Sequence, residues 1–252
     1  MKLYREVRNS LSKKDIYGPF YDADAYSSYV GLSIPFDGSV EDLKGNSVTN
    51  TGVIVSTNTV KVATGSGYFG YQSWVKSIPI ASLLGSGDFT IEAWVNNNGT
   101  AAVLGNNYFV SVIFNDANSG GNTGLALSCS KRGAAGSNNF GYLCFVQTSS
   151  GNVYLETPDN ASNWYPDYQS WVHLALERYN TSLTLYRNGA KLLTGTIVSG
   201  ATVKANSDGT GIALGRSSNY TNGYFVGYMD GFRATIGTAR YKGVFTPGTN
   251  YA

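Results

Sequence analysis

The stretch WVHLALERYNTSLTLYRNGAKLL, residues 171–193, decides the fold. Apolar residues occupy every second position over residues 172–176 and again over residues 183–185. Alternation with a period of two on both sides of a short polar stretch is typical of a β-hairpin. An Asn-Gly pair follows at residues 188–189, and this pair readily takes the positive φ angles of a tight primed turn. The sequence therefore predicts a third strand that begins at Ala190 and folds straight back.

Composition favours one large all-β domain with a short extension. Charged residues make up only 13% of the 252 residues, against about 25% in a typical soluble domain. Further β-like runs, separated by Gly and Asn, are typical of a sandwich. These predicted strands lie at residues 29–36, 88–95, 102–104, 109–114, 124–130, 141–147 and 153–157. The net charge of +2 is too small to favour nucleic acid as a partner, and no apolar run is long enough to span a membrane.

Three blocks of the sequence together resemble a known family. They are the hairpin at residues 171–193, the strand GDFTIEAWV at residues 87–95 and the stretch GYMDGFRATIGTARYKGVFTP at residues 227–247. In their order along the chain, these blocks are similar to the concanavalin-like jelly roll in its laminin-G-like form. The last stretch looks most like the version carried by virion proteins of tailed bacteriophages. The resemblance covers residues 29–252 and implies an all-β jelly-roll sandwich of two antiparallel sheets, but it says much less about function.

Residues 1–28 differ from the rest and are predicted to form an N-terminal anchoring arm. Apolar residues spaced by four suggest a short amphipathic helix, and aromatic residues follow around a Gly-Pro bend. The predicted anchoring residues are Leu3, Tyr4, Val7, Leu11, Tyr17, Phe20 and Tyr21. A helix of about three turns is marginal alone in water, so we expect the arm to dock on other virion proteins or on neighbouring copies, with a trimer favoured. The alternative is that the arm packs on its own domain.

The sequence does not predict an enzyme. Retaining glycosidases built on this jelly roll carry two carboxylates on one strand, about 5 Å apart. Here the corresponding outward positions hold Glu92 and then Trp94, with no second carboxylate two or four residues further on. The single histidine, His173, alternates with Trp171 and Ala175 in a strand, so we expect it to be a packing residue. No catalytic residue is therefore predicted.

A structural calcium ion is an expectation that comes from the resemblance. Related jelly rolls hold Ca²⁺ where the closing strand meets the first turns, with an Asp of that strand and backbone carbonyl groups as ligands. Asp230 matches this Asp, and the turns around Asp37 and Asp42 offer the remaining ligands. The alternative is that Asp230 caps a β-bulge.

Two loops, residues 160–170 and 215–225, carry side chains suited to sugars. Aromatic rings cover the apolar side of a sugar ring, and amide side chains hold its hydroxyl groups. The candidate glycan-binding residues are Trp94, Asn160, Asn163, Trp164, Tyr165, Tyr168, Asn219 and Tyr220. The same aromatic residues suit a protein interface equally well.

These observations predict a non-enzymatic bacteriophage structural protein, a head decoration, fibre or tail component that displays a lectin-like jelly roll on the virion surface. The alternative is a carbohydrate-binding module that recognises host-surface glycans. Residues 1–15 contain no apolar signal-peptide core, so we expect assembly in the bacterial cytoplasm. In that compartment Cys129 and Cys144 are expected to stay reduced, although a hairpin could bring them together as a disulfide.

Overall fold

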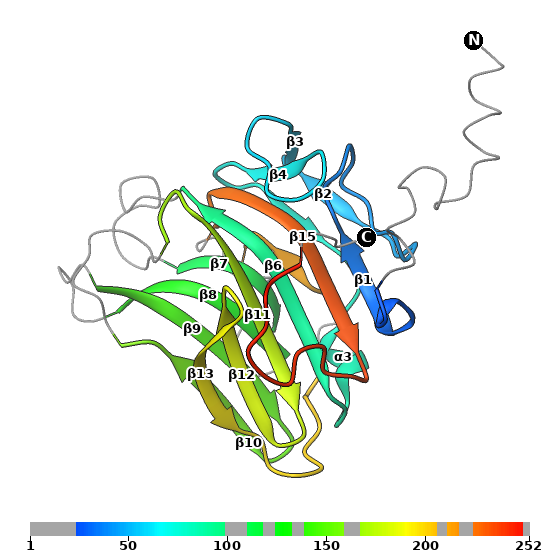
Figure 1. Ribbon diagram of the computed structural model, residues 1–252, viewed down its shortest axis with the longest axis vertical. Coiled ribbons are helices and arrows are strands. Elements are labelled where there is room, and N and C mark those ends of the chain that lie inside the picture. Colours follow the sequence, from blue (N-terminus) through cyan, green and yellow to red (C-terminus); the bar gives the residue numbers. More distant parts are fainter. Residues whose placement is uncertain are drawn as a thin grey trace.

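The computed structural model of the protein describes residues 24–98, 110–117, 124–132, 139–158, 167–205, 211–216 and 224–248. In these ranges the chain forms two antiparallel β-sheets packed face to face (Figure 1), so the predicted all-β sandwich is confirmed. The described helices are short: the 3-10 turn η2 (Ser27–Tyr29) and the helix α3 (Ala81–Leu84). None of the helices in these ranges is long and apolar enough to cross a membrane.

The first sheet, sheet A, has the strand order β13-β12-β11-β6-β15-β4-β3, with β1 paired beside β15. Its strands are β1 (Val30–Ile34), β3 (Ile54–Ser56), β4 (Ser66–Phe69), β6 (Phe89–Asn97), β11 (Trp171–Tyr179), β12 (Ser182–Arg187), β13 (Ala190–Thr196) and β15 (Gly227–Ile236). The second sheet, sheet B, has the order β10-β9-β8-β7-β14-β5-β2. Its strands are β2 (Thr49–Thr51), β5 (Trp74–Lys76), β7 (Val110–Ala117), β8 (Gly124–Arg132), β9 (Asn139–Thr148), β10 (Gly151–Glu156) and β14 (Ala213–Leu214).

The strand β6 lies in the centre of sheet A, and all of its residues are buried. It pairs with β11 on one side and with β15 on the other, where Ile91 lies opposite Ala234. Its inward residues face sheet B and join one apolar core. Across that core, Phe232 of β15 meets Phe114 of β7 edge to face, with ring centroids 6.1 Å apart. Burial of such apolar surface is the main stabilising contribution to the sandwich.

The predicted hairpin at residues 171–193 is confirmed as β11, β12 and the start of β13. The φ angles of Asn188 and Gly189 are 50° and 79°, as a primed turn requires. Leu183 and Leu185 are completely buried in the core. Local alternation and turn chemistry therefore suffice to specify this part of the sheet.

The chain after β15 crosses back over the outer face of sheet A, the face turned away from sheet B (Figure 1, red). We call residues 237–248 the C-terminal tail. The rings of Tyr241 and Phe245 stack on each other, with centroids 3.4 Å apart, and the Phe245 N–H donates to the Gly189 carbonyl at 3.0 Å. Because the tail covers this face, outward residues such as Tyr186 are also buried, which strand alternation alone does not predict.

Cys129 of β8 and Cys144 of β9 are free thiols, both fully buried. The register places Cys129 opposite Tyr142 and Cys144 opposite Leu127, so the two cysteines are diagonal neighbours. Burial raises the pKa of both thiols well above their usual range, so neither is a reactive thiolate.

The predicted strand at residues 102–104 lies outside the described residues. So do residues 1–23, which include all seven of the predicted anchoring positions. The remainder of that predicted arm, residues 24–28, is described and leads through η2 into β1.

Replacing Gly189 with alanine tests how closely the tail fits the hairpin. A Cβ at Gly189 would lie 1.7 Å from the Phe245 carbonyl oxygen, whereas a Cβ at Gly200 would meet nothing within 4 Å. Both glycines have positive φ angles, so both substitutions strain the backbone similarly, by about 1–2 kcal/mol. We expect Gly189→Ala to lower the free energy of unfolding in urea by about 1–3 kcal/mol more than Gly200→Ala. Equal losses would show that the tail is not held against the turn.

Candidate functional site

The outward residues of β6 organise the outer face of sheet A. These residues are Thr90, Glu92, Trp94 and Asn96. The strand register places His173 and Asp230 on either side of Trp94, and Trp171 and Tyr228 on either side of Asn96. The face therefore carries two different arrangements, a buried charge cluster around Glu92 and an aromatic group around Asn96.

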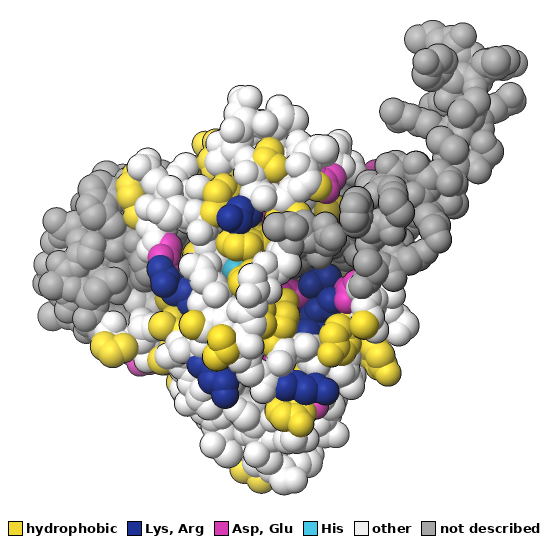
Figure 2. All heavy atoms as spheres, in the orientation of Figure 1, with side chains coloured by type: hydrophobic (Ala, Val, Ile, Leu, Met, Phe, Trp, Pro, Cys, Tyr) yellow, Lys and Arg dark blue, Asp and Glu magenta, His cyan; other side chains and the backbone are white. Residues whose placement is uncertain are grey.

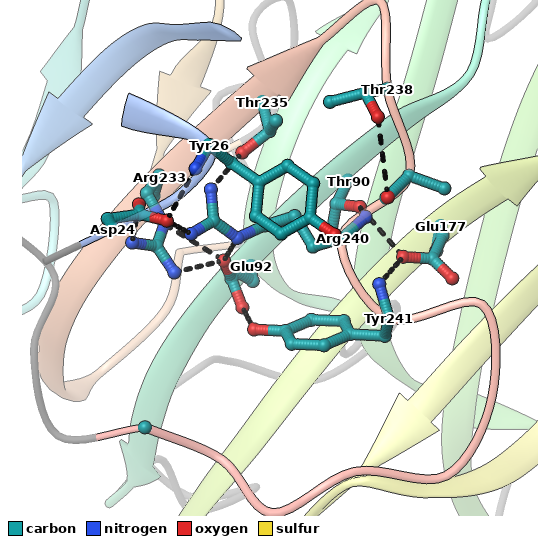
Figure 3. Close-up of polar contacts among 12 residues, drawn as sticks. Asp24, Tyr26, Thr90, Glu92, Glu177, Arg233, Thr235, Thr238, Arg240 and Tyr241 are labelled. Carbon is teal, nitrogen blue, oxygen red and sulfur yellow. Dashed lines mark hydrogen bonds and ion pairs between the residues drawn. The ribbon is translucent and has the colours of Figure 1, made fainter. Parts of the chain in front are cut away.

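Glu92 is completely buried, and its carboxylate is the centre of the charge cluster (Figure 3). Its Oε1 accepts hydrogen bonds from Arg233, at 2.9 Å from Nε and 2.7 Å from Nη2, and lies 3.4 Å from Nε of Arg240. Its Oε2 lies 3.1 Å from Nε2 of His173 and accepts a hydrogen bond from the Tyr241 hydroxyl. Burial alone would raise the pKa of Glu92, but the charge of Arg233 and the hydrogen bond from His173 hold it well below its usual range.

A second carboxylate, Asp24, balances the two guanidinium groups. Its Oδ2 lies 2.9 Å from Nη1 of Arg233, and its Oδ1 pairs with Arg240. The Arg240 guanidinium also lies 5.0 Å from the ring centroid of Tyr26. Burial opposes ionisation of Asp24, but the hydrogen bond from Arg240 keeps its pKa below the ordinary value. The end of the predicted arm is thus fixed to the domain and to the tail.

Glu177 of β11 holds the tail from the neighbouring strand. Its carboxylate accepts hydrogen bonds from the backbone N–H groups of Tyr241 and Lys242, both at 2.8 Å, and from the Thr90 hydroxyl at 2.9 Å. The Tyr186 hydroxyl donates a longer bond of 3.4 Å. Glu177 is therefore a second outward carboxylate beside Glu92, and its oxygens are used to anchor the tail.

Trp94 lies at the border of the charge cluster and is only 7% exposed. The Lys61 ammonium group lies 4.3 Å from its ring centroid, and the His173 ring meets it edge on, with centroids 5.2 Å apart. Its indole N–H points to the Gly248 carbonyl at 3.4 Å. Trp94 therefore does not offer an open ring face to a sugar. His173 is fully buried, which confirms the prediction of a packing role.

An aromatic platform lies beyond Trp94 on the same face. We use this name for four residues on adjacent strands: Tyr68 of β4, Tyr228 of β15, Asn96 of β6 and Trp171 of β11. The rings of Tyr68 and Tyr228 are 5.1 Å apart at their centroids and tilted by 45°, and all three aromatic residues are partly exposed. Asn96 is 8% exposed. Within the described part of the chain, its buried Oδ1 atom has no hydrogen-bond partner.

Most of the predicted glycan-binding residues cannot be compared with the platform. Asn160, Asn163, Trp164, Tyr165, Asn219 and Tyr220 lie outside the described residues. Tyr168 is described, and its backbone forms a parallel bridge with Asn97, the residue next to Asn96. The predicted sugar-binding loop at residues 160–170 therefore ends beside the platform.

The three aspartates predicted to hold calcium do not form one ligand set. Asp42 accepts hydrogen bonds from Ser33, Lys44 and Asn46, while Asp37 accepts from Thr64 and Gly65. Asp230 accepts from the backbone N–H groups of Lys61 and Val62, at 3.0 and 2.8 Å. Over the described ranges, no group of three or more His, Cys, Asp or Glu side chains could hold a metal ion. Each aspartate fixes a turn by accepting hydrogen bonds from its backbone N–H groups, and the calcium ion itself stays a prediction.

The two facing antiparallel sheets define a jelly roll of the concanavalin type. The chain belongs to the concanavalin A-like lectin/glucanases superfamily, whose sequence model matches residues 69–235. No curated protein matches the sequence. The match supports the resemblance to the laminin-G-like jelly roll, and nothing in the comparisons supports a phage origin.

Several solved structures share this fold. Domain 4 of an extracellular GH43 arabinanase from Geobacillus stearothermophilus, solved in complex with arabinotriose, has a TM-score of 0.54 and 16% identity over 84% of this chain and 94% of that one. The binding domain of botulinum neurotoxin serotype D has a TM-score of 0.57 and 15% identity, over 84% of this chain and 49% of that one. A botulinum neurotoxin type C structure, described as requiring two ganglioside molecules for cell entry, has a TM-score of 0.58 and 14% identity, over 85% and 50%. This chain thus spans about half of each neurotoxin chain, and such low identities establish the fold alone.

Glu177, Lys61 and all four platform residues are absent from the site residues that the sequence predicts. Alternation in β11 and β15 does place Glu177 and Tyr228 on an outward face, and this signal could have found them. Their neighbours could not be found in the same way, because they depend on the pairing of strands that are distant in the chain.

Replacing Glu92 with glutamine tests the charge cluster. The variant leaves buried guanidinium groups with only one carboxylate, and breaking a buried pair costs about 3–5 kcal/mol. We expect Glu92→Gln to lower the free energy of unfolding by about that amount, whereas Glu41→Gln, at an exposed position, should change it by less than about 0.5 kcal/mol. Similar chemical unfolding curves for the two variants would contradict the proposed anchoring role of Glu92.

Asp230 gives a second prediction, on pH dependence. Burial raises its pKa from 3.8 to about 7, and the nearby Asp37 adds to this effect, while the N–H groups of Val62 and Lys61 oppose it. The folded protein therefore holds a proton that the unfolded chain releases, so this stabilisation is complete below about pH 4 and is lost as the pH rises towards 7. Asp230→Asn keeps an acceptor oxygen and removes the titration. We expect the difference in melting temperature, variant minus unmodified protein, to increase from pH 4 to pH 8. A difference that does not change with pH would contradict the raised pKa of Asp230.

Proposed function

We propose that this chain is a non-catalytic carbohydrate-binding domain and that the aromatic platform is its binding surface. The platform itself carries the proposal: partly exposed aromatic rings surround a buried amide oxygen that has no partner among the described residues. Apolar and aromatic surface with a few placed polar groups is typical of small-ligand sites. Membership in a lectin-containing superfamily supports this function, as does the arabinotriose complex of a structural neighbour.

We do not propose a glycosidase. A general acid in such an enzyme needs a raised pKa and access to the substrate. Glu92 has a lowered pKa and is buried, and Glu177 is occupied by the backbone of the tail. The two outward carboxylates of sheet A therefore suit attachment of the tail better than catalysis.

Display of this domain on a virion is a second candidate function, favoured by the sequence of residues 227–247. In this function residues 1–23 would attach the chain to other virion proteins or to further copies of itself, and the platform would meet host-surface glycans. The fixed position of Asp24 beside Arg233 and Arg240 would give the arm a rigid starting point.

Sedimentation analysis tests the attachment part of this second function. We expect the full chain to form a trimer and a chain that begins at Asp24 to be a folded monomer, because Asp24 keeps its ion pairs while the predicted anchoring residues are removed. A monomeric full-length chain would remove the basis for a trimeric arm.

A glycan array tests the carbohydrate-binding proposal itself. We expect at least one saturable saccharide ligand, and we expect Tyr228→Ala to bind it at least about fivefold more weakly, because a stacking ring is lost. Tyr154→Ala is the matched control, since Tyr154 is 55% exposed on the edge strand β10 of sheet B. The proposal fails if no saccharide binds, or if the two tyrosine variants lose affinity equally.

A further inference from the structure

A lysine stands beside the platform without a charged partner. Lys61 is exposed, and none of the ion pairs among the described residues includes it. Its ammonium group lies 4.3 Å from the ring centroid of Trp94. Figure 2 shows basic side chains set among hydrophobic ones on this face of the molecule. A cation over an aromatic ring retains donors that can still bind an anion.

The position of Lys61 is fixed by its loop. Residues 57–65 connect β3 to β4, and two carboxylates hold this loop at separate points. Asp230 accepts hydrogen bonds from the N–H groups of Lys61 and Val62, and Asp37 accepts from those of Thr64 and Gly65, both at 2.9 Å. Because the backbone is held at Lys61 and again at Thr64 and Gly65, little loop ordering remains to oppose binding.

The nearby carboxylates do not cancel the charge of Lys61. Glu92 is neutralised by Arg233 and Arg240. Asp230 is buried, and its Oδ2 accepts the backbone N–H groups of Lys61 and Val62. The ammonium group of Lys61 therefore leaves a positive charge at the border of the platform. The whole chain carries a net charge of +2.

The platform and Lys61 are neighbours on the outer face of sheet A, joined by Trp94. Trp94 and Asn96 are two positions apart on β6, which separates them by about 7 Å along the strand. Trp171 packs against the cluster that Trp94 forms with Val62, so the lysine loop and the platform share one surface. An apolar ring face would rest on Tyr228 and Trp171, a hydroxyl group would donate to Asn96 Oδ1, and an anionic substituent would meet the lysine.

We infer that Lys61 and the aromatic platform form one subsite for a carboxylated sugar residue, a uronic or sialic acid type of saccharide. This inference rests on the carbohydrate-binding function proposed above. The subsite selects acidic saccharides over their neutral counterparts, because the ammonium group has a partner only when the ligand carries a carboxylate.

Calorimetric binding to matched pairs of probes tests this inference. The pairs are sialyllactose with lactose, and oligogalacturonate with its methyl ester. We expect the acidic member of at least one pair to bind more tightly, and Lys61→Gln to weaken that binding about fivefold, the upper range for an exposed ion pair. Lys61→Arg should retain the affinity. Lys204→Gln is the control, since Lys204 is exposed and its backbone N–H donates to Gln147 of β9, in sheet B.

The outcomes separate the inference from the proposed function. If neutral saccharides bind as tightly as acidic ones, with Tyr228→Ala weakening both and Lys61→Gln neither, the inference is overturned and the carbohydrate-binding function stands. Equal losses in Lys61→Gln and Lys204→Gln also overturn it, because they indicate bulk charge attraction. If no saccharide of either kind binds, both fail.

Discussion

The burial of one ionised carboxylate constrains the rest of the structure. Glu92 lies at the centre of sheet A, where a charge without partners would cost several kcal/mol. Its partners come from different parts of the chain: Arg233 from β15, His173 from β11 and Arg240 from the C-terminal tail. Asp24 then balances the guanidinium groups from the N-terminal side. The ion pairs that neutralise Glu92 therefore hold β15, the C-terminal tail and the first described residues together.

This constraint divides the outer face of sheet A into two parts. The tail closes the middle of the face, where Tyr241 and Phe245 stack on each other and contact His173 and Tyr186. Beyond Trp94, the outer face carries the aromatic platform. The charge cluster and the tail connect β6, β11 and β15, three of the strands that carry the platform. In the proposed function, strands held in place before a ligand binds would favour binding.

The sequence predicts those features of the fold that depend on local rules, such as strand alternation and turn chemistry. Alternation and the Asn-Gly turn specify the hairpin of residues 171–193, and the outward position of Glu92 follows from its strand. Contacts between distant segments do not follow, since Thr90 and Glu177 meet across 87 residues of chain and the tail covers a face that alternation assigns to solvent. The calcium ion stays a prediction, but among the described residues the three aspartates expected around it do not gather into one group. Asp37, Asp42 and Asp230 look like ligands in the sequence, but each is satisfied by backbone N–H groups of a turn that only the folded chain brings near it.

A nuclear magnetic resonance titration of the Glu92 side-chain carboxyl carbon tests most directly whether this group is a structural anion. The buried partners of Glu92 stabilise its charged form, so protonation requires the cluster to open. We predict that its chemical shift stays that of a carboxylate at about pH 4, where a free glutamate is roughly half protonated. A titration midpoint above about pH 5 in the folded protein, as a general acid would show, would contradict the structural role of Glu92 and the division of the outer face that depends on it.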